Sequence, residues 1–362
     1  MKVLLSGGGT AGHVNPALAA AEHLKQTENA QILFIGTKKG MENKLVPKAG
    51  FPMEYIEVSG LIRRLTLKNF VVLKQFITAY NRAKKIIKDF APDVVIGTGG
   101  YVCAPVLFAA HSLKIPTLVH EQNVIPGVTV KMTAATADTI CISFSETVNY
   151  LNKKHKDKCV LTGNPLRESL FDIKKEEARK ALSLDERPFV AAFGGSLGAA
   201  RLNEAVTELI NTTETDHFQI LLGTGERYYE QVTKKLETNK EHVTVKPYID
   251  RMDLVMAAAD VIIGRAGALT VSELCALGKP AILIPSPNVA HDHQTYNAKN
   301  LEKAGAAIVI HEAELSGARL QVAINDIISN PAQARRMSEN GQSIGIADGT
   351  KRIAKAACAL VK

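Results

Sequence analysis

The sequence predicts an α/β protein built from two Rossmann-like domains, whose parallel sheets face each other across a cleft. Its 362 residues exceed what one hydrophobic core usually holds. Short β-branched runs alternate with helical stretches, which is typical of parallel sheets covered on both faces. A strand, a glycine-rich turn and a helix start occur twice, as VLLSGGGTAGH near residue 4 and VAAFGGSLGAARLN near residue 190.

Each expected strand is a short apolar run that ends near glycine or polar residues. In the first half the expected strands are Lys2–Ser6, Gln31–Ile35, Asp93–Gly97, Thr117–His120 and Thr139–Ile142. In the second half they are Phe189–Phe193, Phe218–Leu222, Thr244–Lys246, Val261–Ile263, Ala281–Ile284 and Ala307–Ile310. Between them the pattern predicts the helices Pro16–Lys25, Ala199–Ile210 and Ala268–Leu277.

A turn signal, Gly163-Asn164-Pro165, marks the expected domain boundary. The N-terminal domain is then 1–163 and the C-terminal domain 164–344. The last stretch, 345–362, has a helical pattern, and we expect it to pack back on the first domain.

The composition excludes several classes of protein. Hydrophobic residues make up 46% and charged residues 22%, as in soluble globular proteins. No apolar run approaches the roughly 18 residues of a membrane span, and the start is too short for a secretory signal. The five cysteines are scattered without a C-x-x-C pair, which favours unreactive thiols over disulfides or zinc. We expect neither a tightly held metal nor a cofactor.

The first glycine loop has the spacing G-x-G-x-x-G at Gly7, Gly9 and Gly12. A dinucleotide site also needs an acid at the end of the second strand, and Glu42 comes too late for that role. A loop before a helix start still suits an anion or a developing negative charge. His13 at this helix start should be neutral and able to accept a proton. The alternative is a structural histidine that caps its own loop.

Further loops strengthen the prediction of a site. Gly97–Tyr101, Gly194–Gly198 and Gly264–Ala268 follow expected strands, and together the glycine loops suggest one phosphorylated ligand in each domain. Glu273, inside the following helix, is either a ligand for ribose hydroxyls or a solvated acid. His120-Glu121-Gln122-Asn123 ends a buried strand and indicates a site.

The polar stretch Asp292-His293-Gln294, with Asn297 after it, has two interpretations of equal weight: part of a ligand site, or an ordinary polar loop and helix cap.

The motifs GGGTAGHVNPALA, GTGGYVCAP, HEQN, GNPLR, GGSLGAARLN, RAGALTVSE and HQTYNA occur in this order along almost the whole chain. In this the sequence resembles the MurG family of N-acetylglucosaminyltransferases. The resemblance implies a glycosyltransferase-B fold and inverting transfer of GlcNAc from UDP-GlcNAc. The acceptor would be the C4 hydroxyl of MurNAc in lipid I, undecaprenyl-pyrophosphoryl-MurNAc-pentapeptide. The product would be lipid II of peptidoglycan synthesis, made with a β1,4 link.

The resemblance also implies residue roles. His13 would be the general base, with His120 and Glu121 as its helpers, and Gly99, Gly100 and Tyr101 would face the acceptor pyrophosphate. Arg265 and Arg167 are candidate cations for the leaving diphosphate. The implied donor contacts are Thr10, Ala11, Gly12, Asn123, Arg167, Ser196, Ile249, Ala268, Leu269, Thr270, Val271, Ser272, Glu273 and Gln294.

Two positions depart from the family pattern. Ala11 stands where a second glycine is usual, and its methyl group requires a negative φ. Val130 stands where an asparagine is common, which leaves the acceptor contact of that asparagine in doubt.

The net charge of +8 includes a concentrated basic stretch. Segment 61–88 carries eight Lys and Arg with no acid before residue 89, interleaved with apolar residues. This pattern predicts a surface that lies on an anionic membrane, with 61–76 as the exposed part and the later residues packed on the core. Nucleic-acid binding is disfavoured because no aromatic RNA motif accompanies the charge. Together with this segment, the resemblance implies a peripheral location on the cytoplasmic face of the bacterial membrane, with other cell-wall synthesis proteins as further partners.

Two rival functions remain. A UDP-GlcNAc 2-epimerase or a glycolipid or natural-product glycosyltransferase could share the fold, although an epimerase needs no lipid-facing segment. A non-catalytic nucleotide- or RNA-binding module is opposed by the intact loops and His13.

Overall fold

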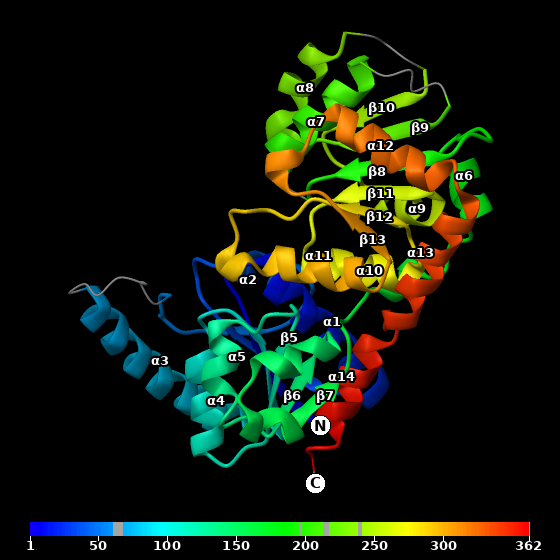
Figure 1. Ribbon diagram of the computed structural model, residues 1–362. Coiled ribbons are helices and arrows are strands. Elements are labelled where there is room, and N and C mark those ends of the chain that lie inside the picture. Colours follow the sequence, from blue (N-terminus) through cyan, green and yellow to red (C-terminus); the bar gives the residue numbers. More distant parts are fainter. Residues whose placement is uncertain (61–67, 196, 213–216, 238–240, 362) are drawn as a thin grey trace. The chain divides into compact units, whose positions relative to one another are not determined.

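The computed structural model describes residues 1–60, 68–195, 197–212, 217–237 and 241–361. The chain divides into two compact units. Unit 1 comprises Met1–Leu166 and Ala347–Lys362, and unit 2 comprises Arg167–Ile346. Each unit contains one parallel sheet with helices on both faces (Figure 1).

The sheet of unit 1 has seven strands in the order β3-β2-β1-β4-β5-β6-β7, all paired in parallel. Its inner strands are buried on both faces, and separate apolar clusters fill the two sides. The strands are β1 Lys2–Gly7, β2 Gln31–Gly36, β3 Met53–Tyr55, β4 Val94–Gly99, β5 Thr117–Glu121, β6 Thr139–Ile142 and β7 Cys159–Leu161.

The sheet of unit 2 has six parallel strands in the order β10-β9-β8-β11-β12-β13. One large apolar cluster packs it against α7 and α12. The strands are β8 Phe189–Phe193, β9 Gln219–Gly223, β10 Val243–Lys246, β11 Val261–Gly264, β12 Ala281–Leu283 and β13 Ala307–Val309.

Helices connect the strands of each sheet. In unit 1 they are α1 Ala11–Glu28, α2 Glu42–Lys48, α3 Lys68–Phe90, α4 Cys103–Ser112, α5 Val128–Thr133 and α14 Gly349–Cys358. In unit 2 they are α6 Lys175–Ala181, α7 Ala200–Thr212, α8 Tyr229–Lys235, α9 Met252–Ala258, α10 Ala268–Leu277, α11 His293–Lys303, α12 Gly317–Ile328 and α13 Pro331–Ile344. Short 3₁₀ turns are η1 Ser145–Tyr150, η2 Lys153–Lys158, η3 Glu168–Leu170, η4 Glu226–Tyr228, η5 Ala290–Asp292 and η6 Glu312–Glu314.

All eleven strands expected from the sequence are confirmed within one or two residues. The edge strands β3 and β7 were not expected, and neither of them has a buried residue. The first helix begins at Ala11, ahead of the expected start at Pro16. Pro16 lies inside α1, and His13 is therefore in the first turn of the helix.

The last helix, α14, belongs to unit 1, although the chain reaches it from unit 2. Ile353, Ala354 and Ala357 are buried against the core on the α1 side of the sheet. The Thr350 hydroxyl donates to the carbonyl oxygen of Leu166, 3.2 Å away, so both crossing segments are joined within unit 1.

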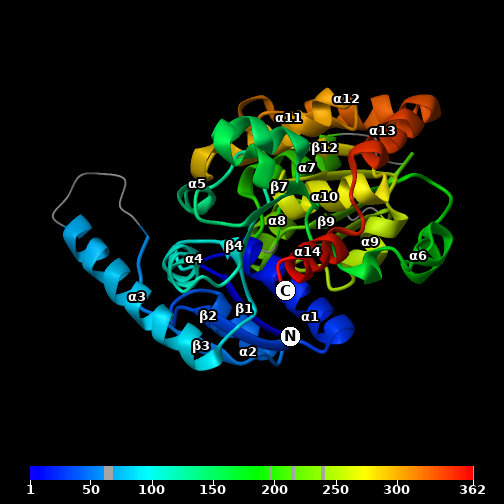
Figure 2. The ribbon, with the colours of Figure 1, turned by 90° about the horizontal axis from the view of Figure 1, so that it is seen from below.

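Helix α3 has two different halves. From Ala79 onward its inner face is buried against α4 and the core. Toward its start, Val71 and Leu73 are each 56% exposed and Ile77 is 53% exposed. This end of α3 projects away from the rest of unit 1 in both views (Figures 1 and 2). The first part of the predicted membrane segment, 61–67, lies outside the described residues.

Among the described residues, the helices are either too short or too polar to cross a bilayer.

The docking of α14 gives a testable contribution to stability. Ile353→Ala should lower the free energy of unfolding of unit 1 by about 2–5 kcal/mol, because it opens a cavity in the core. Lys355→Ala, on the exposed face of the same helix, should change it by less than about 0.5 kcal/mol. Denaturant unfolding of both variants checks this, and equal effects would contradict it.

Candidate functional site

The strand order places the glycine loops at the switch point of each sheet. In unit 1 the strands that follow β1 are added first on one side of it, as β2 and β3, and then on its other side, from β4 onward. The loops after β1 and β4 start beside this reversal. In unit 2 the order reverses in the same way beside β8, and the loops after β8 and β11 start there. Ligands of open parallel sheets bind at the carboxyl ends of the strands at this point. The topology therefore assigns one candidate site to each unit.

The two loops of unit 1 interlock through their backbones. Gly8 N–H donates to the carbonyl oxygen of Gly99, 3.2 Å away. Gly9, Gly99 and Gly100 have positive φ. A Cβ atom on Gly100 would lie 2.1 Å from the carbonyl oxygen of Gly8, so only glycine permits this approach. The ring of Tyr101 lies 3.3 Å from where a Cβ on Gly9 would stand.

His13 is held by the same loops. The hydroxyl of Thr98 donates to the His13 carbonyl oxygen at 2.6 Å. The imidazole Nδ1 lies 3.2 Å from the carbonyl oxygen of Gly8 and 3.2 Å from the hydroxyl oxygen of Thr10. A Cβ on Gly99 would come within 3.0 Å of Nε2, so the glycine leaves room for the ring. The half-buried imidazole is thus fixed at the switch point of unit 1.

Glu42 is the residue of this site that sequence reasoning missed. It is 1% exposed, and its Oε2 accepts from Gly9 N–H at 2.9 Å. Its Oε1 accepts from Thr37 N–H at 3.0 Å and from the Thr37 hydroxyl at 2.7 Å. The negative charge expected at the glycine loop is therefore supplied, at Gly9, by the protein itself. The excess of glycines around it, at positions 36 and 40 as well as 8, was a signal in the sequence.

His120 is fully buried at the end of β5. Its Nε2 lies 3.0 Å from the carbonyl oxygen of Gly163, and its Nδ1 lies 2.9 Å from the Gln122 amide nitrogen. Burial lowers the pKa of His120 to about 4, although the Gly163 carbonyl opposes this. A neutral ring that donates from Nε2 to Gly163 and accepts at Nδ1 satisfies both contacts. The structure assigns His120 to the framework of the strand ends.

Glu121 organises the loop after β5. One carboxylate oxygen accepts from the backbone N–H and side-chain amide of Asn123, at 2.9 and 3.2 Å. The other accepts from Gly127 N–H at 2.7 Å. Burial raises the pKa of Glu121, and these donors oppose the rise. The carboxylate therefore shapes the turn that presents Asn123 and begins α5 at Val128.

In unit 2 the loop after β8 packs on the loop after β9. A Cβ on Gly198 would lie 2.1 Å from the Thr224 carbonyl oxygen, and Gly198 has positive φ. Asn203 on α7 donates to the same carbonyl at 2.9 Å. Ile249 is buried after β10, against Gly223. Ser196, an expected donor contact in this loop, lies outside the described residues.

Arg265 joins three strand ends of unit 2. Its Nη1 donates to the carbonyl oxygens of Ile284 and Pro285, both at 3.2 Å. The same atom lies 2.7 Å from Oε2 of Glu312, and both side chains are mostly buried. The charge expected to meet a diphosphate is thus offset by Glu312, and an anionic ligand would compete with this carboxylate.

Helix α10 begins directly after this arginine. Its expected donor residues differ in exposure, because Ala268, Leu269 and Thr270 are half-buried whereas Val271 and Ser272 are buried. Gly267 precedes the helix, and the first turn carries no acidic residue, so the positive end of the helix dipole is not offset locally.

Glu273, one turn further along α10, is half-buried. Burial raises its pKa to about 6, and the charge of Arg167, exposed at the start of η3, opposes the rise. A carboxylate that is ionised at neutral pH but poorly solvated gains from hydroxyl donors, which is what a ribose offers.

Gln294 follows an unusual backbone. His291 and Asp292 both have positive φ, which is uncommon for residues other than glycine and is frequent at functional sites. The Gln294 side-chain oxygen accepts from Ser286 N–H at 2.9 Å. Asn297, fully buried on α11, donates to the carbonyl oxygen of Ala266 at 3.1 Å. These bonds fix α11 beside the loop that carries Arg265.

The comparisons with known proteins cover both units. Residues 3–142 match the glycosyltransferase family 28 N-terminal domain, and residues 189–353 match the glycosyltransferase family 28 C-terminal domain. A protein from Acetivibrio thermocellus is 47% identical over 98% of this chain and 96% of its own length. It is named UDP-N-acetylglucosamine–N-acetylmuramyl-(pentapeptide) pyrophosphoryl-undecaprenol N-acetylglucosamine transferase. A protein of that name from Thermoanaerobacter sp. is 45% identical over 98% of both chains.

The crystal structure of Acinetobacter baumannii MurG superposes with a TM-score of 0.81 and 28% identity, over 99% of each chain. This chain belongs to the MurG family of glycosyltransferases. Its glycosyltransferase-B fold is shared more widely. A UDP-GlcNAc 2-epimerase from Neisseria meningitidis has a TM-score of 0.72 at 16% identity, over 99% of this chain and all of its own, which shows likeness of fold alone.

The two departures from the MurG family pattern have structural outcomes. Ala11 is the first residue of α1 and is not among the residues with positive φ, so its methyl group is accommodated. Val130 is buried on α5 and packs into the core of unit 1.

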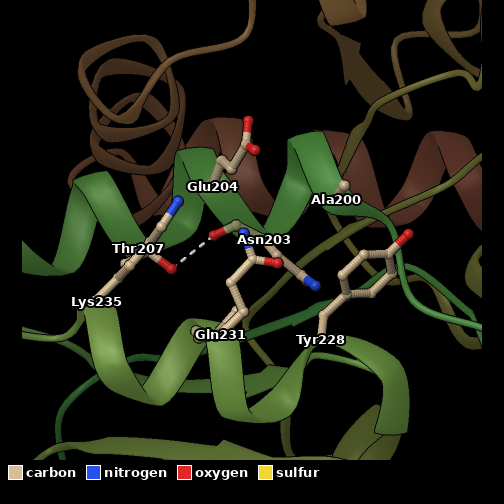
Figure 3. Close-up of a pocket in the computed structure, with 8 residues that line it drawn as sticks. Ala200, Asn203, Glu204, Thr207, Tyr228, Gln231 and Lys235 are labelled. Atoms are coloured by element: carbon tan, nitrogen blue, oxygen red, sulfur yellow. Dashed lines mark hydrogen bonds between the residues drawn. The ribbon is translucent and has the colours of Figure 1, made fainter.

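A pocket on unit 2 lies apart from the residues expected in a MurG-family site. Helices α7 and α8 face each other across it, and the Thr207 hydroxyl donates to the Asn203 carbonyl oxygen at 2.7 Å (Figure 3). None of its described lining residues is an expected substrate contact. Within the described part of the chain, no cluster of three or more histidine, cysteine or acidic side chains could hold a metal ion.

Because the pKa of Glu273 is raised, replacing its carboxylate by a neutral side chain should stabilise unit 2, by an amount that depends on pH. Below about pH 4.5 the carboxyl is protonated in both folded and unfolded states and contributes no difference. Above about pH 6 it is ionised in both, at a cost to the folded state. Glu273→Gln should therefore stabilise unit 2 by about 1–2 kcal/mol above pH 6, and the gain should vanish as the pH falls to 4.5.

Denaturant unfolding at pH 4.5 and pH 7.5 checks this, with exposed Glu302→Gln on α11 as the matched control. If Glu273→Gln stabilised unit 2 equally at both pH values, the gain would not come from a raised pKa of Glu273.

Proposed function

We propose that this protein transfers GlcNAc from UDP-GlcNAc to the C4 hydroxyl of MurNAc in lipid I, forming lipid II. The observation that carries the proposal is the near full-length similarity, at 41–47% identity, to curated proteins named for this transfer. The half-buried His13 at the switch point of unit 1 supports it, because this imidazole would give the reaction a base.

Unit 2, with the stretch expected at 164–344, would bind the donor. Glu273 would hold the ribose hydroxyls, Ile249 the uracil through its backbone, and Gln294 the sugar. The start of α10 would face the diphosphate, with Arg265 and Arg167 as cations nearby. The remaining donor contacts in unit 2 would be Ser196 and residues Ala268, Leu269, Thr270, Val271 and Ser272.

Unit 1, with the stretch expected at 1–163 and helix α14, would bind the acceptor. Gly99, Gly100 and Tyr101 would face its pyrophosphate. Four residues of this unit would contact the donor, namely Thr10, Ala11, Gly12 and Asn123. His120 and Glu121 would be the helpers of His13, acting through the strand ends that they fix by hydrogen bonds.

The chemistry is a single in-line displacement. His13 takes the proton of the C4 hydroxyl as its oxygen bonds to the anomeric carbon of GlcNAc, and the bond to the UDP diphosphate breaks. General base catalysis of this kind contributes roughly 10²–10⁴-fold. The developing charge on UDP is stabilised by backbone N–H groups and arginines aimed at it.

The segment 61–88 would place the enzyme on the cytoplasmic face of the membrane, where other cell-wall synthesis proteins would be its neighbours. Support comes from the exposed apolar residues at the start of α3 and from exposed Lys74, Lys85 and Lys88. Arg82 contributes less, because it pairs with Glu54 at 3.0 Å. Each remaining cation near an anionic surface adds about 1 kcal/mol.

The alternative is a UDP-GlcNAc 2-epimerase, favoured only by the likeness of fold to such enzymes. Incubation with UDP-GlcNAc and a short-chain lipid I analogue separates the two. UDP release that needs the acceptor, with a β1,4-linked disaccharide product, is the expected result. UDP release without acceptor, together with ManNAc, would establish the epimerase instead.

His13→Ala should lower turnover in that assay by at least about 10²-fold, because the base is lost while the donor contacts of unit 2 remain. UDP-GlcNAc affinity, measured by calorimetry, should stay close to that of the wild type. Turnover close to normal in this variant would remove His13 as the base.

Membrane binding is tested by flotation with vesicles containing phosphatidylglycerol. Leu73→Ser/Ile77→Ser and Lys74→Glu/Lys85→Glu should each weaken binding at low salt, because they remove apolar contact or attraction. Val322→Ser, which alters an equally exposed aliphatic residue on unit 2, is the control. Wild-type protein that fails to float at low salt would refute the membrane proposal.

A further inference from the structure

The peptide group between Gly8 and Gly9 is hydrogen-bonded at both ends by side chains. Its N–H, from Gly9, donates to Oε2 of Glu42 at 2.9 Å. Its carbonyl oxygen, from Gly8, lies 3.2 Å from Nδ1 of His13. A peptide group is planar and rigid. The hydrogen bonds to the Glu42 carboxylate and to the His13 imidazole therefore fix the orientation of the Gly8–Gly9 peptide plane from opposite sides.

The space around Glu42 is shaped for its carboxylate. A Cβ atom on Gly8, Gly36 or Gly40 would come within 2.7, 2.2 and 2.0 Å of neighbouring atoms, with Glu42 side-chain atoms at 2.7, 2.6 and 2.0 Å. The two oxygens together accept from three donors, Gly9 N–H, Thr37 N–H and the Thr37 hydroxyl. An acceptor-only group suits this set, since each of its bonds is then charge-assisted.

The Gly8 carbonyl selects the tautomer of His13. A carbonyl oxygen only accepts, so the contact at 3.2 Å requires the proton on Nδ1. The Thr10 hydroxyl oxygen, also 3.2 Å from Nδ1, can share that proton as a second acceptor. In this tautomer the lone pair is on Nε2, on the ring edge that faces Gly99. Nε2 is therefore the atom that accepts a proton.

We propose that Glu42 is a positioning residue for catalysis, acting on His13 through the Gly8–Gly9 peptide. The proposal rests on the function proposed above. The carboxylate polarises the peptide, which strengthens the acceptor that holds Nδ1–H. When Nε2 takes the proton of the attacking C4 hydroxyl, the resulting imidazolium is stabilised by a hydrogen-bonded chain that ends on a negative charge. An acidic residue orients a catalytic histidine in the same sense in hydrolase triads, but by direct contact.

This role of Glu42 also explains why the backbone N–H of Gly9 does not serve to bind a phosphate. The backbone N–H that would meet a phosphate is already bonded to a buried carboxylate. A second negative charge at the same donor would be repelled. The loop holds the base, and the acceptor pyrophosphate is left to other groups.

The test compares Glu42→Gln with Thr37→Val in the assay with UDP-GlcNAc and the short-chain lipid I analogue. Glutamine has the shape of glutamate, but its NH₂ group must face a backbone donor, so one of the three hydrogen bonds is lost. Thr37→Val removes a hydrogen bond to the same carboxylate and leaves the one to Gly9. Thermal unfolding of each variant sets an assay temperature at which all are folded.

We expect Glu42→Gln to lower kcat by about 10- to 100-fold with little change in the KM for UDP-GlcNAc, by analogy with residues that orient metal-binding histidines. Thr37→Val should stay close to the wild type. Equal losses in the two variants, or a loss confined to KM, would show that Glu42 is merely structural.

A double-mutant cycle asks whether Glu42 acts through His13. His13→Ala/Glu42→Gln should be no slower than His13→Ala alone, because the base that Glu42 orients is already absent. If Glu42→Gln slowed the His13→Ala variant by the same factor by which it slows the wild type, the proposal would be overturned.

An independent readout is the tautomer of His13 by ¹⁵N NMR of histidine-labelled protein, with His13→Ala identifying the signal. Wild type should show the proton on Nδ1, and Glu42→Gln should shift the population toward Nε2–H. An unchanged tautomer would refute the link between Glu42 and His13. A wild type that makes no acceptor-dependent UDP would refute the proposed function instead, while the NMR result would still stand.

Discussion

In each sheet, the strands that come after the first strand in the sequence are added first on one side of it and then on its other side. β2 and β3 extend the sheet of unit 1 in one direction from β1, and β4 through β7 extend it in the other. The loops after β1 and β4 therefore leave their strands beside each other but lead to different helices. Ligands of open parallel sheets bind at the carboxyl ends of the strands beside such a reversal. The positions of His13 and of the glycine loops depend on this reversal.

The loops at the carboxyl ends of β1 and β4 differ from those of a dinucleotide site. There the loop N–H groups meet a pyrophosphate and an acid after β2 meets the ribose. Here the acid comes later, at the first residue of α2, and bonds to the loop itself. The glycines admit close approach in both cases, but in this chain the groups that approach are protein groups: Glu42 to Gly9, Thr98 to the His13 backbone, and Gly99 to the imidazole.

Unit 2 shows the complementary arrangement. Arg265 pairs with Glu312 and donates to the end of β12, and Gln294 accepts a hydrogen bond from Ser286 N–H. Glu273 stays poorly solvated, with a raised pKa. The poorly solvated carboxylate favours a ligand that brings hydroxyl donors, and the start of α10, which has no acid in its first turn, favours an anion.

The sequence by itself determined the two parallel sheets, eleven of the thirteen strands that the structure describes and the glycine loops that follow them, because these depend on patterns within about ten residues. It also determined the family, through motifs spread along the whole chain. Only the tertiary structure decided that Glu42 bonds to Gly9, that His120 supports Gly163 and that Arg265 pairs with Glu312. Each of these contacts joins residues 33 to 47 positions apart, so no local pattern records them. They exist because parallel pairing brings strand ends together at one edge of a sheet, where buried polar groups must find partners.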